Sequence, residues 1–171
     1  TVRFLDASGL AAQAGTFGSE FHSVWPNIPV EGMRGVQKEV ELLFQQVQER
    51  ISLVLLEAPM GEGKTEAGIY AALQMGRQWG KCGFYVGLPT AATSNQMAGR
   101  MRTLMEMHHL PDSVRLLHSM AWLTDEGEEA PWPKFETEEE RYASGWLLPA
   151  RRGLLGSYAV GTVDQAMMSV L

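Results

Sequence analysis

Residues 51–65 read I-S-L-V-L-L-E-A-P-M-G-E-G-K-T, and this stretch decides which fold to expect. Its first six residues are β-branched or leucine apart from one serine, which is typical of a buried strand in a parallel sheet. A glycine-rich loop follows and leads into a run rich in Ala, Leu and Met that favours a helix. A strand, a glycine-rich turn and a helix in this order predict a loop that binds phosphate groups.

The loop from Ala58 to Thr65 has the chemistry that a nucleoside triphosphate and its Mg²⁺ require. Glycine lacks a Cβ atom, so the backbone can curl tightly and approach the phosphates. The N–H groups at the helix start are unpaired, and the helix dipole adds partial positive charge there. We expect Lys64 to bind the β- and γ-phosphates and Thr65 to offer its hydroxyl to Mg²⁺, which makes these two the predicted catalytic residues. The predicted ATP-binding residues of the loop are Gly61, Glu62, Gly63, Lys64, Thr65 and Glu66.

Outside the loop, strand patterns alternate with helix patterns. Helices are expected over about 36–47, 64–79 and 93–107 and from 164 onward, and strands over 51–56, 84–88, 114–117 and 158–162. This alternation predicts an α/β fold with a mostly parallel sheet flanked by helices. Residues 1–33 read as an irregular lead-in, residues 34–171 as the domain, and residues 124–141 as an exposed acidic loop.

Composition excludes several classes of protein. The chain has 171 residues, which suits one domain, and its net charge of −6 argues against tight binding to nucleic acid through bulk charge. Contacts through backbone N–H groups remain open, because they carry no formal charge. The single cysteine, Cys82, excludes an intrachain disulfide and makes a cysteine-based zinc site implausible, so a cytoplasmic location is expected. No signal peptide and no apolar run of about 18 residues is present, so we expect no membrane partner.

Three further segments occur where a helicase would have them. Residues 87–96 read G-L-P-T-A-A-T-S-N-Q, residues 160–165 read V-G-T-V-D-Q, and Gln37 lies in M-R-G-V-Q. The first resembles helicase motif Ia and the second motif Ic, both of which contact single-strand phosphates, while Gln37 resembles the adenine-reading glutamine of the Q motif. The general phosphate-loop template has glycine where this chain has Ala58, and the resulting form A-x-x-G-x-G-K-T is similar to that of superfamily 2 helicases.

Together these segments, with R-R-G-L-L-G-S-Y-A-V-G-T-V-D-Q-A at 151–166, resemble the CRISPR-associated helicase–nuclease of type I interference systems, with subtype I-E fitting best. The resemblance covers residues 34–171. It implies a RecA-like P-loop domain in an ATP-driven 3′-to-5′ single-strand DNA translocase. Such a protein is recruited by an RNA-guided surveillance complex and degrades DNA with a separate HD nuclease domain. It further implies Arg34 and Gln37 as nucleotide-binding residues, and as DNA-binding residues Pro89, Thr90, Asn95, Gln96, Gly161, Thr162 and Gln165.

Hydrolysis needs more than the loop, namely an acid on Mg²⁺ and a residue that positions the attacking water. Helicases supply both from a D-E-x-H or D-E-x-D strand end after motif Ic, and the sequence ends at Leu171 without one. Asp125-Glu126 has a similar form, but it opens the acidic loop and precedes motif Ic. No histidine is followed by aspartate, so the HD dyad is missing. We therefore expect a piece, truncated before the Walker B strand, that binds ATP and hydrolyses little.

Each match also has a plainer explanation. Leu88-Pro89-Thr90 can be a strand end with a helix cap, Gly161-Thr162 can be a turn into a capped helix, and Gln37 can be an ordinary exposed helical residue. A different reading of the whole chain is a non-catalytic nucleotide-binding or docking module, with the acidic loop and Arg151-Arg152 recognising a partner. The sequence does not decide whether that arginine pair contacts DNA, a partner or solvent. A P-loop kinase is disfavoured by Ala58 and by the G-L-P-T-A segment.

Overall fold

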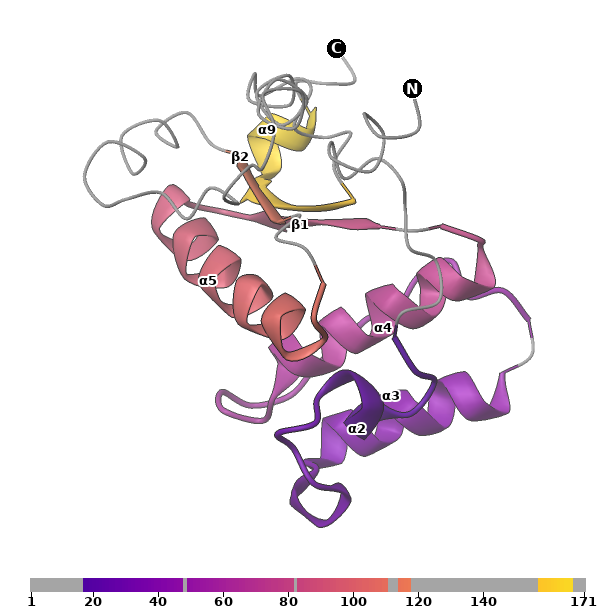
Figure 1. Cartoon of the computed structure of the whole chain (residues 1–171). Coiled ribbons are helices and arrows are strands. Elements are labelled where there is room, and N and C mark those ends of the chain that lie inside the picture. Colours follow the sequence, from indigo (N-terminus) through magenta and orange to yellow (C-terminus); the bar gives the residue numbers. More distant parts are fainter. Residues whose placement is uncertain (1–16, 48, 82, 111–113, 118–156, 168–171) are drawn as a thin grey trace. The chain divides into compact units, whose positions relative to one another are not determined.

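The computed structural model describes residues 17–47, 49–81, 83–110, 114–117 and 157–167. They belong to two compact units, one within residues 13–82 and the other containing residues 83–167. Figure 1 labels most of their elements. In the first unit these are α2 (Phe21–Val24), the 3₁₀ helix η1 (Val30–Gly32), α3 (Gly35–Gln46) and α4 (Lys64–Gln78). In the second they are β1 (Phe84–Leu88), α5 (Ala91–Met107), β2 (Val114–Leu117), β3 (Tyr158–Thr162) and α9 (Val163–Met167).

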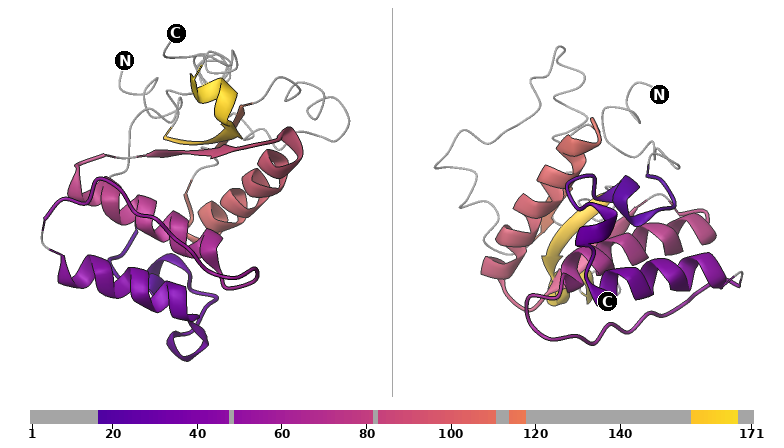
Figure 2. Two further views of the ribbon diagram at one scale, coloured as in Figure 1. Left: turned by 180° about the vertical axis from the view of Figure 1, so that it is seen from behind. Right: turned by 90° about the horizontal axis from the view of Figure 1, so that it is seen from below.

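In the first unit α3 and α4 pack against each other, as both views of Figure 2 show. The helices predicted over both segments are confirmed. Val40 of α3 and Tyr70 of α4 are buried, and the rings of Phe44 and Tyr70 pack edge to face with centroids 6.1 Å apart. α4 ends at Gln78, and Gly80 follows two residues later with a φ of 61°. That left-handed conformation is the usual one just after a helix, and glycine adopts it without steric cost.

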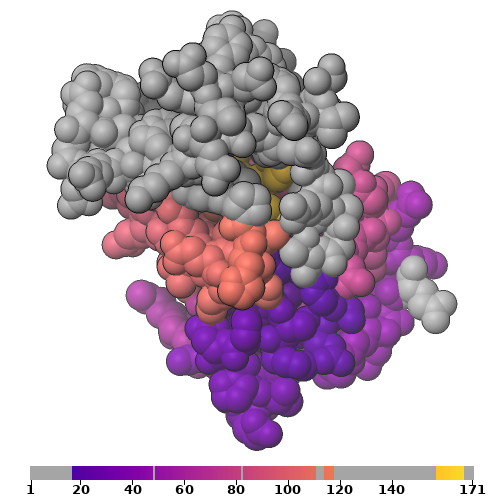
Figure 3. Space-filling view, in the orientation of Figure 1, coloured from indigo at the N-terminus to yellow at the C-terminus, as the bar shows by residue number. Residues whose placement is uncertain are grey.

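The described part of the predicted lead-in, residues 17–33, packs into the core of the first unit. Its buried apolar residues are Phe17, Phe21, Val24, Trp25 and Met33. In the space-filling view the indigo part of the chain, which includes this segment, lies directly against the purple part of the same unit (Figure 3). This segment therefore contributes to the unit that contains the glycine-rich loop.

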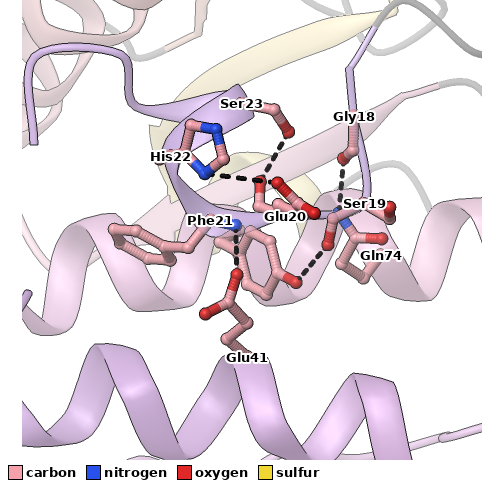
Figure 4. A network of polar contacts seen from close by, with 9 residues as sticks. Gly18, Ser19, Glu20, Phe21, His22, Ser23, Glu41 and Gln74 are labelled. Atoms are coloured by element: carbon pink, nitrogen blue, oxygen red, sulfur yellow. Dashed lines mark hydrogen bonds and ion pairs between the residues drawn. The ribbon is translucent and has the colours of Figure 1, made fainter. Parts of the chain in front are cut away.

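Side chains of α3 and α4 bind the main chain of this segment (Figure 4). The three hydrogen bonds run from Phe21 N to Glu41 Oε1 at 2.6 Å, from Tyr70 Oη to Ser19 O at 2.6 Å and from Gln74 Nε2 to Gly18 O at 3.0 Å. Each satisfies a backbone group that regular secondary structure leaves unpaired.

The Tyr70 hydroxyl makes stability depend on alkaline pH. Burial, together with the nearby Glu41 carboxylate, raises the pKa of Tyr70 from 10.0 to about 12. The proton is thus held more tightly in the folded state. The resulting stabilisation is complete below pH 10 and is lost as the pH rises from 10 to about 12. We expect the urea midpoint to fall more steeply over this interval in the wild type than in Tyr70→Phe, which cannot ionise. Parallel pH profiles for the two proteins would contradict this.

The strand predicted over residues 51–56 is wrong. The segment has no regular secondary structure, although its side chains alternate between partly buried, as at Val54 and Leu56, and exposed. Leu53 and Leu55 are 83% and 80% exposed. A strand requires a neighbour that pairs with its N–H and C=O groups, and no described residue forms backbone hydrogen bonds with residues 52–56. Apolar composition favours burial, but it does not supply the partner.

The second unit contains a parallel three-stranded sheet in the order β1-β3-β2. The central strand is the most buried, with Tyr158, Ala159 and Val160 each at most 8% exposed. α5 packs on the sheet, and α9 contacts β3 and β1. The predicted α/β class with a parallel sheet flanked by helices is confirmed, and the three predicted strands of this unit have the expected bounds.

α5 begins at Ala91, two residues before the predicted start at Thr93. The reason is local, because the Thr90 hydroxyl accepts a hydrogen bond from the Thr93 N–H at 3.3 Å and so caps the helix. Met101, Leu104 and Met105 of this helix are buried. α9 likewise begins one residue early, at Val163.

Candidate functional site

The glycine-rich loop takes a conformation that only glycine adopts easily. Gly61 and Gly63 have φ values of 83° and 74°, in the left-handed region. Gly63 immediately precedes α4, so the helix N-terminus opens directly from the loop. Helix geometry leaves the N–H groups of Lys64 and Thr65 without acceptors inside the helix. The loop therefore presents backbone donors and a positive dipole end, as expected for an anion site.

Gln37 of α3 lies against this loop. It is only 3% exposed, so its interpretation as an ordinary exposed helical residue is wrong. Its Nε2 lies 3.5 Å from the carbonyl oxygen of Gly63, and its Oε1 accepts a hydrogen bond from the Arg34 N–H at 2.9 Å. The structure thus brings the two residues predicted upstream of the loop, Arg34 and Gln37, to the start of α4. Their contact with a nucleotide remains a prediction.

The Lys64 side chain folds back over its own loop. Its Nζ donates hydrogen bonds to the carbonyl oxygens of Ala58 and, at 2.6 Å, of Pro59. Backbone carbonyls carry partial negative charge, and an ammonium group is a compact donor with three protons. The ammonium therefore already lies inside the loop, and phosphate oxygens would compete for it with these two carbonyls.

Trp25 supports the first turn of α4, and sequence reasoning missed it. The side chain is 5% exposed, and its Nε1 donates a hydrogen bond to the Glu66 carbonyl oxygen at 3.2 Å. The two residues are 41 positions apart in the chain. The glycine, serine and proline content of the lead-in predicts an irregular segment, and no short-range pattern connects Trp25 with the loop.

Gly63 cannot be replaced without disturbing the loop. A Cβ atom there would lie against the Gln37 amide nitrogen, at a φ that L-residues avoid. We expect Gly63→Ala to lower the affinity for ATP and Mg²⁺ by roughly three- to tenfold, since strain of this kind costs on the order of 1 kcal/mol. Gly68→Ala is the matched control, because its Cβ would meet only Leu56 Cδ1 at 3.9 Å. Equal affinities in calorimetry would show that the loop tolerates the change.

The segment after β1 holds four of the predicted DNA-binding residues, Pro89, Thr90, Asn95 and Gln96. The Thr90 hydroxyl caps α5, and Ser94 Oγ donates a hydrogen bond to the Thr90 carbonyl oxygen at 2.9 Å. The plainer explanation, a strand end with a helix cap, therefore holds for Thr90. Of the two residues within α5, Gln96 is exposed and Asn95 is partly buried.

The segment after β3 holds Gly161, Thr162 and Gln165. Gly161 is buried. A Cβ atom there would collide with the Leu117 carbonyl oxygen and would lie 2.5 Å from the Tyr85 hydroxyl. Thr162 is the last residue of β3 and is the register partner of Leu88. Thr162, the last residue of β3, and Gln165, the third residue of α9, are both partly exposed.

Several predictions lie outside the described residues. These are the acidic loop 124–141, Asp125-Glu126, Arg151-Arg152 and Cys82. Within the described ranges no three His, Cys, Asp or Glu side chains come together in a way that could hold a metal ion. No helix among the described residues is long and apolar enough to cross a membrane.

The fold and the loop define the chain as an α/β protein of the RecA-like P-loop class. No family model matches the sequence. The CRISPR-associated endonuclease/helicase Cas3 of Thermus thermophilus is 36% identical over 98% of the chain and 19% of its own length. The CRISPR-associated nuclease/helicase Cas3 of Streptococcus thermophilus is 32% identical over 78% of the chain and 16% of its length.

Solved structures agree. The crystal structure of T. fusca Cas3-ATP has a TM-score of 0.73 at 34% identity, covering 96% of this chain and 17% of that one. T. fusca Cas3-AMPPNP has a TM-score of 0.71 at 35% identity, covering the same shares of the two chains. The chain is a homologue of the CRISPR-associated helicase–nuclease Cas3, and it spans 16–19% of the length of these relatives.

Proposed function

We propose that this chain is the ATP-binding lobe of an ATP-dependent single-strand DNA translocase that acts with a nuclease in CRISPR antiviral defence. The observation that carries the proposal is the loop at residues 58–65. Two left-handed glycines lead there into a helix N-terminus, with Lys64 inside the loop and Gln37 against it. The similar T. fusca Cas3 chains were crystallised with ATP, ADP and AMPPNP, which supports a nucleotide as the ligand.

Mg²⁺ is the cofactor that the loop fits. Thr65 is the second residue of α4, at the end of the glycine-rich loop, and hydroxyl and phosphate oxygens are ligands that Mg²⁺ prefers. When bound with ATP, Mg²⁺ would neutralise charge on the phosphates. The chain's own residues would bind and orient the triphosphate, with Lys64 as the cation at the β- and γ-phosphates.

Single-stranded DNA is the proposed second ligand, and the RNA-guided surveillance complex the proposed partner of the complete protein. The candidate DNA contacts are the segments that follow β1 and β3. The carboxyl ends of these parallel strands are register partners, Leu88 beside Thr162, so both segments leave the sheet at the same edge. Such edges are where open α/β sheets bind ligands.

The chain by itself is expected to bind ATP and to hydrolyse little or none of it. The physical reason is that the sequence contains no D-E-x-H or D-E-x-D segment to hold Mg²⁺ and position the attacking water. Calorimetry with AMPPNP and Mg²⁺ measures binding, and phosphate release with and without single-stranded DNA measures hydrolysis.

Three outcomes are informative. Binding without hydrolysis, with affinity raised by single-stranded DNA, supports a lobe of a helicase. Robust DNA-stimulated hydrolysis would contradict the prediction that this chain has no acidic residue to hold Mg²⁺ and position the attacking water. The absence of any nucleotide binding would remove the proposed function itself.

A further inference from the structure

Tyr85 of β1 lies across the sheet toward the end of β3. Its hydroxyl donates a hydrogen bond to the Thr162 carbonyl oxygen at 2.7 Å, although the two residues are 77 positions apart. Thr162 is the last residue of β3, and α9 begins at the next one. The bond therefore joins the second residue of β1 to the point where the neighbouring strand ends.

Two glycines make room for this side chain. Gly87 and Gly161 are register partners on β1 and β3. The position that a Cβ atom would occupy at Gly87 lies 3.5 Å from Tyr85 Cε1, and at Gly161 it lies 2.5 Å from the Tyr85 hydroxyl. Side chains at i and i+2 of a strand point to the same face. The tyrosine ring thus lies over Gly87 and Gly161, where neither strand has a side chain.

The hydrogen bond fixes the peptide group between Thr162 and Val163. A peptide group is planar, so holding its carbonyl oxygen also fixes the direction of the next N–H and of the chain that follows. Burial raises the pKa of the Tyr85 hydroxyl, so that it remains a proton donor well above neutral pH. The donor is the Tyr85 side chain and not a backbone N–H of β1, so this bond is additional to the backbone hydrogen bonds that pair the two strands.

We propose that Tyr85 is a positioning residue for single-stranded DNA, which holds the segment after β3 in register with the segment after β1. This inference rests on the proposed function, since both segments are candidate DNA contacts. Phosphates that bridge the two segments would require a fixed spacing between them. Without the bond, the start of α9 can rotate about the strand end, and part of the DNA-binding energy is used to order it.

The test compares Tyr85→Phe with Tyr70→Phe. Both substitutions remove one tyrosine hydroxyl that donates to a backbone carbonyl, at 2.7 Å and 2.6 Å respectively, so both lower stability by a similar mechanism. Binding of a fluorescently labelled oligothymidylate is measured by anisotropy with AMPPNP and Mg²⁺ present, well below both melting temperatures. Calorimetry of AMPPNP binding is the second readout.

Tyr85→Phe is expected to weaken oligothymidylate binding by roughly three- to tenfold, the loss of one hydrogen bond, with unchanged AMPPNP affinity. Tyr70→Phe is expected to leave oligothymidylate binding unchanged. Equal DNA affinities for Tyr85→Phe and the wild type would overturn the positioning role while the proposed function stands. Equal losses in both variants would show a general effect of stability and overturn it as well. A wild type that binds no DNA would remove the positioning role together with the DNA-binding part of the proposed function.

Discussion

Replacing Lys64 with alanine is expected to weaken the binding of ATP with Mg²⁺ by roughly ten- to a hundredfold, since a charged hydrogen bond contributes about 1.5–3 kcal/mol. The ammonium already lies within the loop, on the carbonyl oxygens of Ala58 and Pro59. Phosphate oxygens carry full negative charge and attract it more strongly than these carbonyls do. The loss should therefore exceed that of any neutral substitution in the loop.

Lys81→Ala provides the control for this variant. Lys81 is an exposed lysine of the same unit, so its removal changes the net charge equally without touching the loop. Calorimetry with AMPPNP and Mg²⁺ gives both affinities, and a thermal melt checks that each protein is folded. If Lys64→Ala binds as tightly as Lys81→Ala, then Lys64 is not part of the nucleotide site.

Gly161→Ala is expected to destabilise the second unit by about 3 kcal/mol, toward the upper end of what overpacking usually costs. A Cβ atom at this position collides with the Leu117 carbonyl oxygen of β2 and lies 2.5 Å from the Tyr85 hydroxyl. The first of these atoms is backbone in a paired strand, which cannot move aside without breaking the sheet. The second can move only by giving up its bond to Thr162.

Its register partner supplies the control. At Gly87 a Cβ atom would meet Val163 Cγ2 at 3.4 Å and Tyr85 Cε1 at 3.5 Å, which are ordinary contacts. Glycine within a strand is entropically costly, so Gly87→Ala is expected to be neutral or to stabilise by up to about 1 kcal/mol. Urea unfolding of the two variants measures the difference. Similar midpoints for both would mean that the strands separate easily at Gly161.

Local patterns predicted most of the elements, because the spacing of apolar residues along the chain indicates which face of a helix or strand is buried. The strands at 84–88, 114–117 and 158–162 have the expected bounds, and α4 begins at Lys64 as predicted. α5 begins at Ala91 rather than at Thr93, because the Thr90 hydroxyl accepts a hydrogen bond from the Thr93 N–H and caps the helix there. The stretch at 51–56 has the composition of a buried strand, yet no described residue pairs with it. Pairing is a property of two segments, and composition reports only one.

The candidate site divides in the same way. The turn at Gly61 and Gly63 followed from residue types alone, because glycine adopts those φ values without steric cost. The contacts of Trp25 and Tyr85 could not be predicted in this way, because no short-range pattern shows which distant carbonyl group an indole N–H or a phenol hydroxyl will reach. Their roles depend on a carbonyl group 41 or 77 residues away.

The sequence by itself determined the glycine-rich turn before α4, the alternation of helices and strands, and the resemblance to a helicase, because each depends on residues that are neighbours in the chain. Only the tertiary structure decided that β3 lies between β1 and β2, that Gln37 is buried against Gly63, and that Tyr85 reaches Thr162. The physical reason is that an apolar strand has the same pattern wherever it lies in a sheet. Its position is set by the combined packing and hydrogen bonding of segments far apart in sequence.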